Sequence, residues 1–427
     1  TGEFDSRGES LSNRLYHPII NDWSCSVAHR QLCRHVLSHR LDVIALLTQC
    51  YAKCSKSEVL TPILPPNDHL ASEDNAWASV LLFSLELTRL VRTLSQCVDS
   101  GDLLLTWMWG KLLTINQHAP LGLEPVSLHC IPERAFSLIA SATMRMGLEL
   151  QEIASVLPLR QIAFPSLRVF AFVAESRSDM WIRNGTSGAR HSLFYAFPPY
   201  VEDLCCLDLA LIRMSAAASS IPMSPSSGGK NTVAHFVVDL MLAFGVPIME
   251  LFHHPKRNQS SISVPLSYLE LQQRLQRYDI GNRMALFREM LLLLLAVLVD
   301  RGASMSGNSL SVARKFVIHR LAISSASHSE LARSLPGWIG GSDMVSSDTV
   351  LRQVLEDVAL VRPATNSTPV IYSLRPECMA EIDAYTIMAS KQEQNLLRSR
   401  FPLPDKVLFP PVPQPWRLLL SFAASPV

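Results

Sequence analysis

The sequence has almost no excess of charge of either sign. It contains 38 lysines and arginines against 37 aspartates and glutamates, a formal net charge of +1 over 427 residues. Long-range attraction to DNA or to an anionic membrane requires a strongly positive surface. The charge balance therefore argues against nucleic acid and membrane surfaces as partners.

Long hydrophobic runs are also lacking. The longest, residues 290–299 (MLLLLLAVLV), is flanked by charged residues on both sides. It is about half of the roughly 20 residues that a membrane-spanning helix needs. We therefore expect a buried core helix there. No secretory leader is recognisable at the amino terminus, so we expect the protein in the cytoplasm or the nucleus.

Zinc-binding patterns are absent as well. The nine cysteines include no CxxC pair, which excludes a cross-braced RING from these residues. The densest group of metal-ligating residue types is Cys25, His29, Cys33, His35 and His39. On a helix, its two ends would lie about 21 Å apart, too far to share one ion. We expect no metal ligands in this chain.

Catalytic motifs are missing too. The sequence contains no GxSxG, P-loop or HExxH pattern, and Gly337, Gly340 and Gly341 follow a predicted helix instead of a strand. We therefore expect neither a catalytic residue nor a cofactor. Because the first residue is Thr1, we also expect the chain to be part of a longer polypeptide.

What the sequence does have is apolar material, 48% of its residues, enough for two or three cores. Its patterning predicts a helical segment with a proline-rich loop over 1–124 and a helical scaffold over 125–304. A winged-helix domain over 305–390 follows, and 391–427 hold a helix end and a proline-rich linker. Within the scaffold, the small polar residues of 215–231 (SAAASSIPMSPSSGGKN) predict a disordered insertion.

Two helices are expected in the middle of the scaffold. Apolar spacing places one at 132–157 and a second at 165–183, closed by Asn184 and Gly185. A glycine at that position allows the positive φ angle that commonly ends a helix.

The winged-helix prediction begins with two helices. The first turns Val312, Phe316 and Leu321 inward, together with Ile323. The second follows Ser327, where Glu330 three residues later completes a capping-box pattern, and it stops before Pro336.

A third helix and a hairpin complete the module. Starting at residue 347, apolar residues recur on one helical face, and the runs 359–362 and 369–374 flank the turn-forming residues 364–368. Three short helices and a β-hairpin make a winged helix. The fold class is thus mainly α, a helical bundle followed by a winged-helix module.

The third helix is unsuited to reading DNA. It offers Arg352 and Gln353 against Asp348, Glu356 and Asp357, and the wing adds only Arg362. A recognition helix needs an excess of cations and amides to contact phosphates and base edges. Protein contact or a structural role is therefore favoured over DNA binding.

Several short segments resemble the central region of the N-recognin E3 ubiquitin ligases. The matching positions are 125–129, Met180-Trp181, Arg183-Asn184-Gly185, His319, Leu321, Ile323, His328, Ser329, Glu330, Leu331, Ser334, Leu335, Pro336, Tyr372, Leu374, Pro376, Glu377, Cys378 and 409–415. Ile182 departs from the family pattern, which usually has a basic residue there, and the loop 337–348 lacks the expected acidic stretch.

The resemblance implies a RING-type ligase of the N-degron pathway, which marks proteins with destabilising amino-terminal residues for proteasomal degradation. Such a ligase binds a ubiquitin-conjugating enzyme and the substrate protein through zinc-containing domains. Neither the substrate-binding zinc box nor the RING lies in this chain, so zinc is expected only outside it.

The segment around Trp181 has two interpretations. Trp181 can anchor a core, with Arg183 and Asn184 in a helix cap. Alternatively, these three residues can contact a partner, because tryptophan and arginine are enriched at binding hot spots.

Two other functions remain open at this point. One is a winged-helix nucleic-acid-binding protein, which rests on fold analogy alone. The other is a non-catalytic adaptor that binds partners outside any ligase.

Overall fold

The structure is a computed structural model of the whole chain. It describes residues 31–32, 35–36, 76–96, 130–145, 149–185, 187–196, 198–219, 232–246, 272–273, 275–299, 309–335, 347–364, 369–384, 386, 389 and 391–401.

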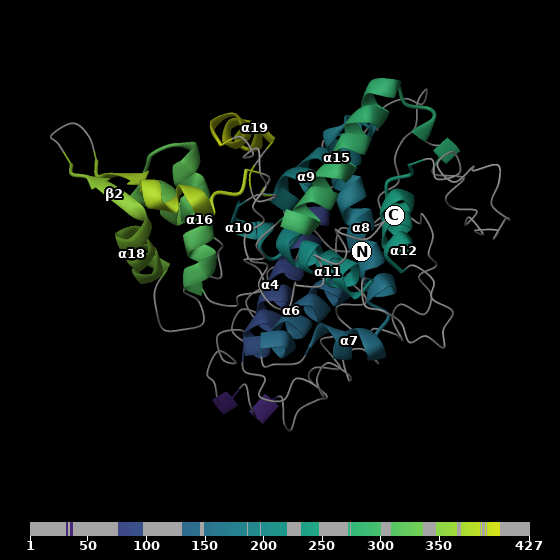
Figure 1. Cartoon of the computed structure of the whole chain (residues 1–427), viewed down its shortest axis with the longest axis horizontal. Helices are drawn as coiled ribbons and strands as arrows, with labels where there is room; N and C mark the ends of the chain where they lie inside the picture. The colour runs from purple at the N-terminus through teal and green to yellow at the C-terminus, as the bar shows by residue number, and fades with distance from the viewer. Residues whose placement is uncertain are drawn as a thin grey trace, which may run out of the picture.

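A helical bundle and a small mixed domain lie side by side (Figure 1). In the bundle, α11 occupies the centre and packs against α6 and α8, while α4 packs on α6, and α12 and α15 pack on α8. The bundle contains α4 (Ala76–Gln96), α6 (Ile131–Arg145), α7 (Leu150–Val156), α8 (Leu159–Arg177), η1 (Ile182–Asn184), α9 (Ser187–Ala196), α10 (Pro198–Val201), α11 (Cys205–Ala218), α12 (Thr232–Ala243) and α15 (Ile280–Val299).

Two helix boundaries differ from the sequence-based prediction. The helix expected over 132–157 is divided into α6 and α7. The helix expected over 165–183 begins earlier, at Leu159, contains Pro165, and ends at Arg177. A proline inside a helix removes one backbone hydrogen bond. Burial of Ile162, Leu167 and other apolar residues on both sides of it keeps α8 continuous, an example of packing that overrides local propensity.

The structure contradicts the start of the insertion predicted at 215–231. Residues 215–218 are the last turn of α11, and Ser215, Ala216 and Ala217 are buried. Small side chains allow neighbouring elements to approach closely at this helix end, so here they indicate tight packing and not a loop. Residues 220–231 lie outside the described part of the chain.

The long apolar run lies in α15, as expected, but the helix is buried on one face only. Met290, Leu293 and Val297 point into the core, whereas Leu291 is exposed. Among the described residues, no helix combines the length and hydropathy required to cross a bilayer.

The second domain is the predicted winged helix. Its β2–β3 pair is the expected antiparallel hairpin, with Ala359 opposite Leu374 and Arg362 opposite Ile371. A third, two-residue strand that the sequence did not reveal extends the sheet in the order β1-β3-β2. The elements are α16 (Ser309–Ile323), β1 (Ala326–Ser327), α17 (His328–Ser334), α18 (Ser347–Val358), β2 (Ala359–Arg362) and β3 (Ile371–Leu374).

The predicted inward faces of these helices are confirmed. In α16, Val312, Phe316 and Leu321 are buried and Ile323 is half-buried. The capping box at the start of α17 is formed by Ser327. The apolar face of α18 consists of Val350, Leu351, Val354, Leu355 and Val358, all buried.

Two further elements follow the sheet, η4 (Pro376–Glu381) and α19 (Lys391–Arg400). Leu397 of α19 and Ala389 pack against Ala322 of α16 in a small second cluster. The main core, in contrast, is continuous from Leu81 in α4 to Cys378 in η4. The bundle and the winged helix therefore share one hydrophobic core.

Several predicted features lie outside the described residues. They are the proline-rich loop at 55–73, the proline-rich linker at 402–415, and the Cys25–His39 group with the exception of His35.

Candidate functional site

The centre of the bundle contains a buried ion pair that joins four helices. Arg134 of α6 donates from Nη2 to Asp208 Oδ2 of α11 at 2.8 Å, and both side chains are fully buried. Ser166 of α8 donates to Asp208 Oδ1 at 3.0 Å, and Tyr195 of α9 donates to Oδ2 at 2.8 Å. Burial, and secondarily the nearby Asp208 carboxylate, raise the pKa of the Tyr195 phenol. Arg134 Nε lies 3.2 Å from both oxygens, so each carboxylate oxygen has at least two donors, an arrangement typical of a structural site.

A second acidic pair lies where α10 leads into α11. Arg92 of α4 donates from Nη2 to Asp203 Oδ1 at 2.7 Å, and its Nη1 lies 4.0 Å from Glu202 Oε1. Burial raises the pKa of Glu202 to about 7, although Arg92 acts in the opposite direction. The positive charge of Lys315, in α16 of the winged helix, also lowers this pKa. Glu202 therefore lies within electrostatic reach of both domains.

Of the two interpretations of Trp181, the structure supports the core anchor and contradicts the partner contact. Its indole Nε1 donates to Glu175 Oε2 at 2.9 Å, and its ring packs edge-on to Phe172 at 4.6 Å between centroids. Only 3% of Trp181 is exposed, so it serves as a packing anchor. Arg183 and Asn184 are half-exposed on η1, and a partner contact by these two residues stays a prediction.

The turn that carries these residues is held by α15 and by the segment that leads into it. Tyr278 donates from its hydroxyl to the Met180 carbonyl at 2.7 Å, and the Asn282 amide donates to the Ser178 carbonyl at 2.6 Å. Gly185 has the predicted positive φ, 72°. The segment thus has a fixed conformation, which would present Arg183 in a defined position.

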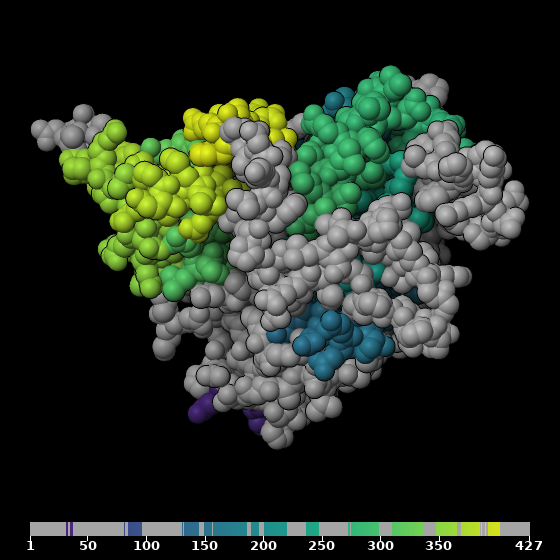
Figure 2. Space-filling model, in the orientation of Figure 1, coloured from purple at the N-terminus to yellow at the C-terminus, as the bar shows by residue number. Residues whose placement is uncertain are grey.

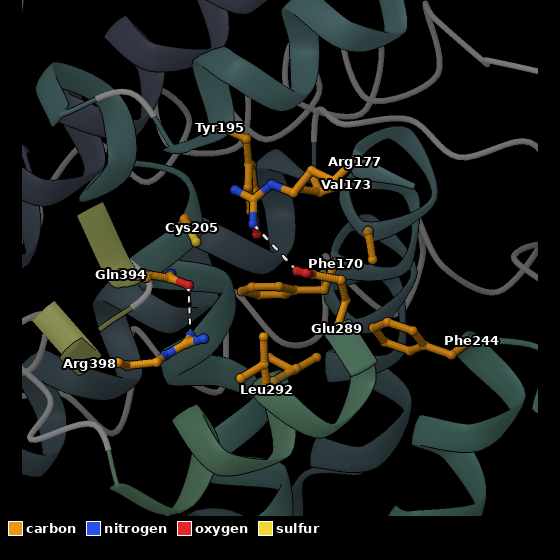
Figure 3. Close-up of a pocket in the computed structure, with 12 residues that line it drawn as sticks. Phe170, Val173, Arg177, Tyr195, Cys205, Phe244, Glu289, Leu292, Gln394 and Arg398 are labelled. Carbon is orange, nitrogen blue, oxygen red and sulfur yellow. Dashed lines mark hydrogen bonds and ion pairs between the residues drawn. The ribbon is translucent and has the colours of Figure 1, made fainter. Parts of the chain in front are cut away.

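A narrow pocket of ≈ 50 Å³ lies between α8, α15 and α19 (Figure 3). Arg177 and Glu289 form an ion pair at 3.8 Å beside it, and Arg398 of α19 donates to Gln394 at 3.0 Å. Small-molecule sites usually have volumes of roughly 300–1,000 Å³. A space of this size suits one or two water molecules and is too small for a metabolite.

The exposed surface of the winged helix contains more acid than base on α18. Arg352 donates to Asp348 at 2.7 Å, so the one cation of this face is already neutralised. Glu356 and Asp357 are exposed beside it. Asp357 is in turn paired with Arg314, so this face has no excess of cations that could contact phosphates and base edges.

Inside the winged helix, Arg314 of α16 connects the helices to η4. It binds Glu381 with two donors, at 3.0 and 2.7 Å, and it also binds Asp357 of α18. The hydrogen bonds to Glu381 raise the pKa of the Arg314 guanidinium further above its usual value. Bidentate pairing of this kind fixes geometry as well as charge.

His319 of α16 makes a second internal connection. Its Nδ1 lies 2.7 Å from the Lys315 carbonyl oxygen, and the Asp383 backbone N–H donates to its Nε2 at 2.9 Å. Because a carbonyl can only accept, the proton belongs on Nδ1 and Nε2 accepts. His319 is therefore a neutral structural side chain in this arrangement, and its place in the family motif is explained by packing.

No group of three or more metal-ligating side chains occurs within the described ranges. The sequence reasoning missed both buried ionic groups of the bundle. A signal for one of them was present, because Asp208 interrupts the otherwise apolar run at 204–212. A lone acid in such a run requires a buried partner.

The fold defines a class, a helical scaffold that shares its core with a winged-helix domain. Residues 312–401 match a more particular group, the E3 ubiquitin-protein ligase UBR1-like winged-helix domain. The chain is also 22% identical over 353 residues to E3 ubiquitin-protein ligase UBR2 of Homo sapiens, with 75% of this chain and 18% of that protein covered.

Two further relatives have similar names. The chain is 25% identical over 287 residues to E3 ubiquitin-protein ligase UBR1 of Drosophila melanogaster, with 64% of this chain and 14% of that protein covered. It is 28% identical over 221 residues to E3 ubiquitin-protein ligase PRT6 of Arabidopsis thaliana, with 51% and 9% covered. These matches confirm the resemblance of the chain to the UBR-type N-recognins. The chain spans at most 18% of the length of these relatives.

Proposed function

We propose that this chain is an internal scaffold segment of a RING-type E3 ubiquitin ligase of the N-degron pathway. In this proposal, the parent polypeptide transfers ubiquitin to proteins with destabilising amino-terminal residues. The substrate-binding zinc box and the RING lie elsewhere in that polypeptide, together with the zinc that they bind. The site of action is the cytoplasm or the nucleus.

The observation that carries the proposal is the shared core of the two domains. A continuous set of buried residues runs from α4 through α11 and α16 to α18. Its winged-helix part matches the UBR1-like domain. A unit of this kind moves as one body, because tightly packed interiors transmit displacement with little deformation. Such a unit can keep a substrate site and a conjugating-enzyme site at a fixed separation.

The test is ubiquitin transfer by the parent polypeptide, with two model substrates that differ only in an arginine or a methionine at the amino terminus. We expect ubiquitin chains on the arginine substrate only. The isolated 427-residue chain should transfer none, because the proposal places the RING outside it. Transfer to both substrates alike, or transfer by the isolated chain, would contradict the proposal.

The scaffold role has a separate test. The bundle and the winged helix meet where α10 packs against α17 and where Glu202 faces the charge of Lys315. Lys315→Glu should weaken this contact and lower the formation of ubiquitin chains on the arginine substrate. Transfer of a single ubiquitin from a ubiquitin-loaded conjugating enzyme to free lysine should be unchanged. Equal loss of both activities would argue for a role in activation of the enzyme instead of a role in spacing.

A further inference from the structure

Four large apolar side chains form an exposed stripe along α15. Ile280 is 71% exposed, Met284 60%, Phe287 37% and Leu291 46%. Their spacings of four, three and four residues place them on one side of the helix. The opposite side, which includes Leu286 and Leu293, is buried in the bundle. The helix therefore has two apolar faces, of which the bundle uses one.

The stripe is narrow, with the spacing of a coiled-coil seam. Ile280, Met284, Phe287 and Leu291 occupy successive d and a positions of a heptad. Helices that insert into a membrane interface have a wider apolar face, whereas an a/d stripe fits the ridge of a single partner helix. Figure 2 shows α15 as a ridge on this side of the molecule.

The charges beside the stripe are positive. Arg283 occupies the g position and Arg288 the e position, and both are exposed. The only acid within α15, Glu289, has 13% of its side chain exposed and lies 3.8 Å from Arg177 of α8 and 3.6 Å from Arg288, so one acid is shared between two arginines. In coiled coils, residues at e and g select the partner by charge. The flanks of this seam therefore favour a helix that carries acids.

We propose that the exposed face of α15 is the docking site for an amphipathic helix of another protein, with acidic residues beside its apolar stripe. A second copy of α15 is a poor occupant, because either direction of pairing would bring arginines together. Apolar burial by four side chains provides the affinity, and Arg283 and Arg288 provide the selectivity. Binding at this site does not depend on ubiquitin transfer, so the docking proposal is tested independently of the proposed function.

The probe is a fluorescent synthetic peptide of three heptads with leucine at a and d and glutamate at e and g. Its control has lysine at e and g. Like charges keep either peptide from pairing with itself. Fluorescence anisotropy with the full 427-residue chain should show binding of the acidic peptide and at least tenfold weaker binding of the basic one. Binding of the acidic peptide should weaken further with added salt.

Substitutions locate the site. Met284→Asp should weaken binding of the acidic peptide at least tenfold, and Ile280→Asp is a second variant of a still more exposed residue. The matched control is Leu193→Asp, where an apolar side chain 70% exposed belongs to another helix, α9. Combined Arg283→Glu and Arg288→Glu substitutions should reverse the preference, so that the chain binds the basic peptide more tightly than the acidic one. Circular dichroism melting curves check that each variant is folded.

Three results would overturn the proposal. The first is equal binding of the two peptides, and the second is equal effects of Met284→Asp and Leu193→Asp. The third is a chain that light scattering shows to be dimeric and that Met284→Asp converts to a monomer, since the occupant would then be a second copy.

Discussion

Arg134 and Asp208 form a fully buried ion pair at 2.8 Å that connects α6 with α11 at the centre of the bundle. Desolvation of two charges costs several kcal/mol, so the pair stabilises the fold less than its distance suggests. The pair instead specifies one arrangement of the helices, because the Asp208 carboxylate also accepts hydrogen bonds from the hydroxyls of Ser166 and Tyr195 and so fixes α8 and α9 in position.

Removal of one member of this pair should be strongly destabilising. Asp208→Ala leaves the Arg134 charge buried without its carboxylate, which typically costs about 3–5 kcal/mol. We expect the melting temperature, measured by circular dichroism, to fall by roughly 10 °C. The double variant Arg134→Met with Asp208→Leu, which removes both charges, should recover most of the loss. A double variant as unstable as Asp208→Ala would show that the pair itself, and not the orphaned charge, matters.

Glu202 should make the stability of the chain depend on pH. Burial raises its pKa from 4.5 to about 7, so the folded state holds a proton that the unfolded state releases. Stability from this group is present below pH 4.5 and is lost as pH rises through 7. Above pH 7 the buried Glu202 carboxylate is charged and destabilises the fold, and Glu202→Gln removes this cost. The variant should therefore be more stable than the parent by about 3 kcal/mol above pH 7, and the two proteins should be equally stable below pH 4.5.

Urea unfolding of both proteins at pH 4.5, 6 and 8 measures this difference. The matched control is Glu356→Gln on the exposed face of α18, which should change the free energy of unfolding by about 0.5 kcal/mol or less. A Glu202→Gln variant that is less stable than the parent at pH 8 would mean that the attraction of Arg92 for the carboxylate outweighs its burial.

The capping box of α17 gives a local prediction. The Glu330 backbone N–H donates to Ser327 Oγ at 3.4 Å, and the Ser327 backbone N–H donates to Glu330 Oε2 at 2.7 Å. The bonds from Ser327 lower the pKa of the Glu330 carboxyl. Ser327→Ala should cost about 1 kcal/mol, measured by urea unfolding. Ser399→Ala, at an exposed serine of α19 outside any cap, should cost a few tenths at most.

Helix α18 could be predicted from sequence because it has one buried side and one solvent-exposed side. In α18, Val350, Val354 and Val358 alternate with exposed polar residues, so periodicity marks the buried face. The capping box marked the start of α17 in the same way. Strand β1 was missed because two residues are too short to show any alternation.

The bundle was harder, since α11 is buried all around. A helix without a polar side has no periodicity to mark its end, and residues 215–218 were therefore assigned to a loop. Trp181 shows the same limit for a site. Its residue type suits a hot spot, but whether it faces solvent or Phe172 is decided by packing that no local pattern encodes.

Arg183 is the part of the predicted contact that remains accessible. It lies on η1, half-exposed, in a turn held by Asn282 of α15 and by Tyr278, which precedes that helix. A surface arginine presented by a fixed turn can contact a partner at low entropic cost. Arg183→Ala should therefore leave the melting temperature of the chain within about 1 °C, because surface substitutions change stability little. In the parent polypeptide it should lower ubiquitin transfer to the arginine substrate by roughly tenfold.

The control for this variant is Arg190→Ala, at an exposed arginine of α9 that lies outside the turn. It should leave transfer unchanged. Full activity of the Arg183→Ala polypeptide would refute the contact. The segment 180–185 would then serve only to anchor Trp181 and to close α8, and its similarity to the N-recognins would reflect folding alone.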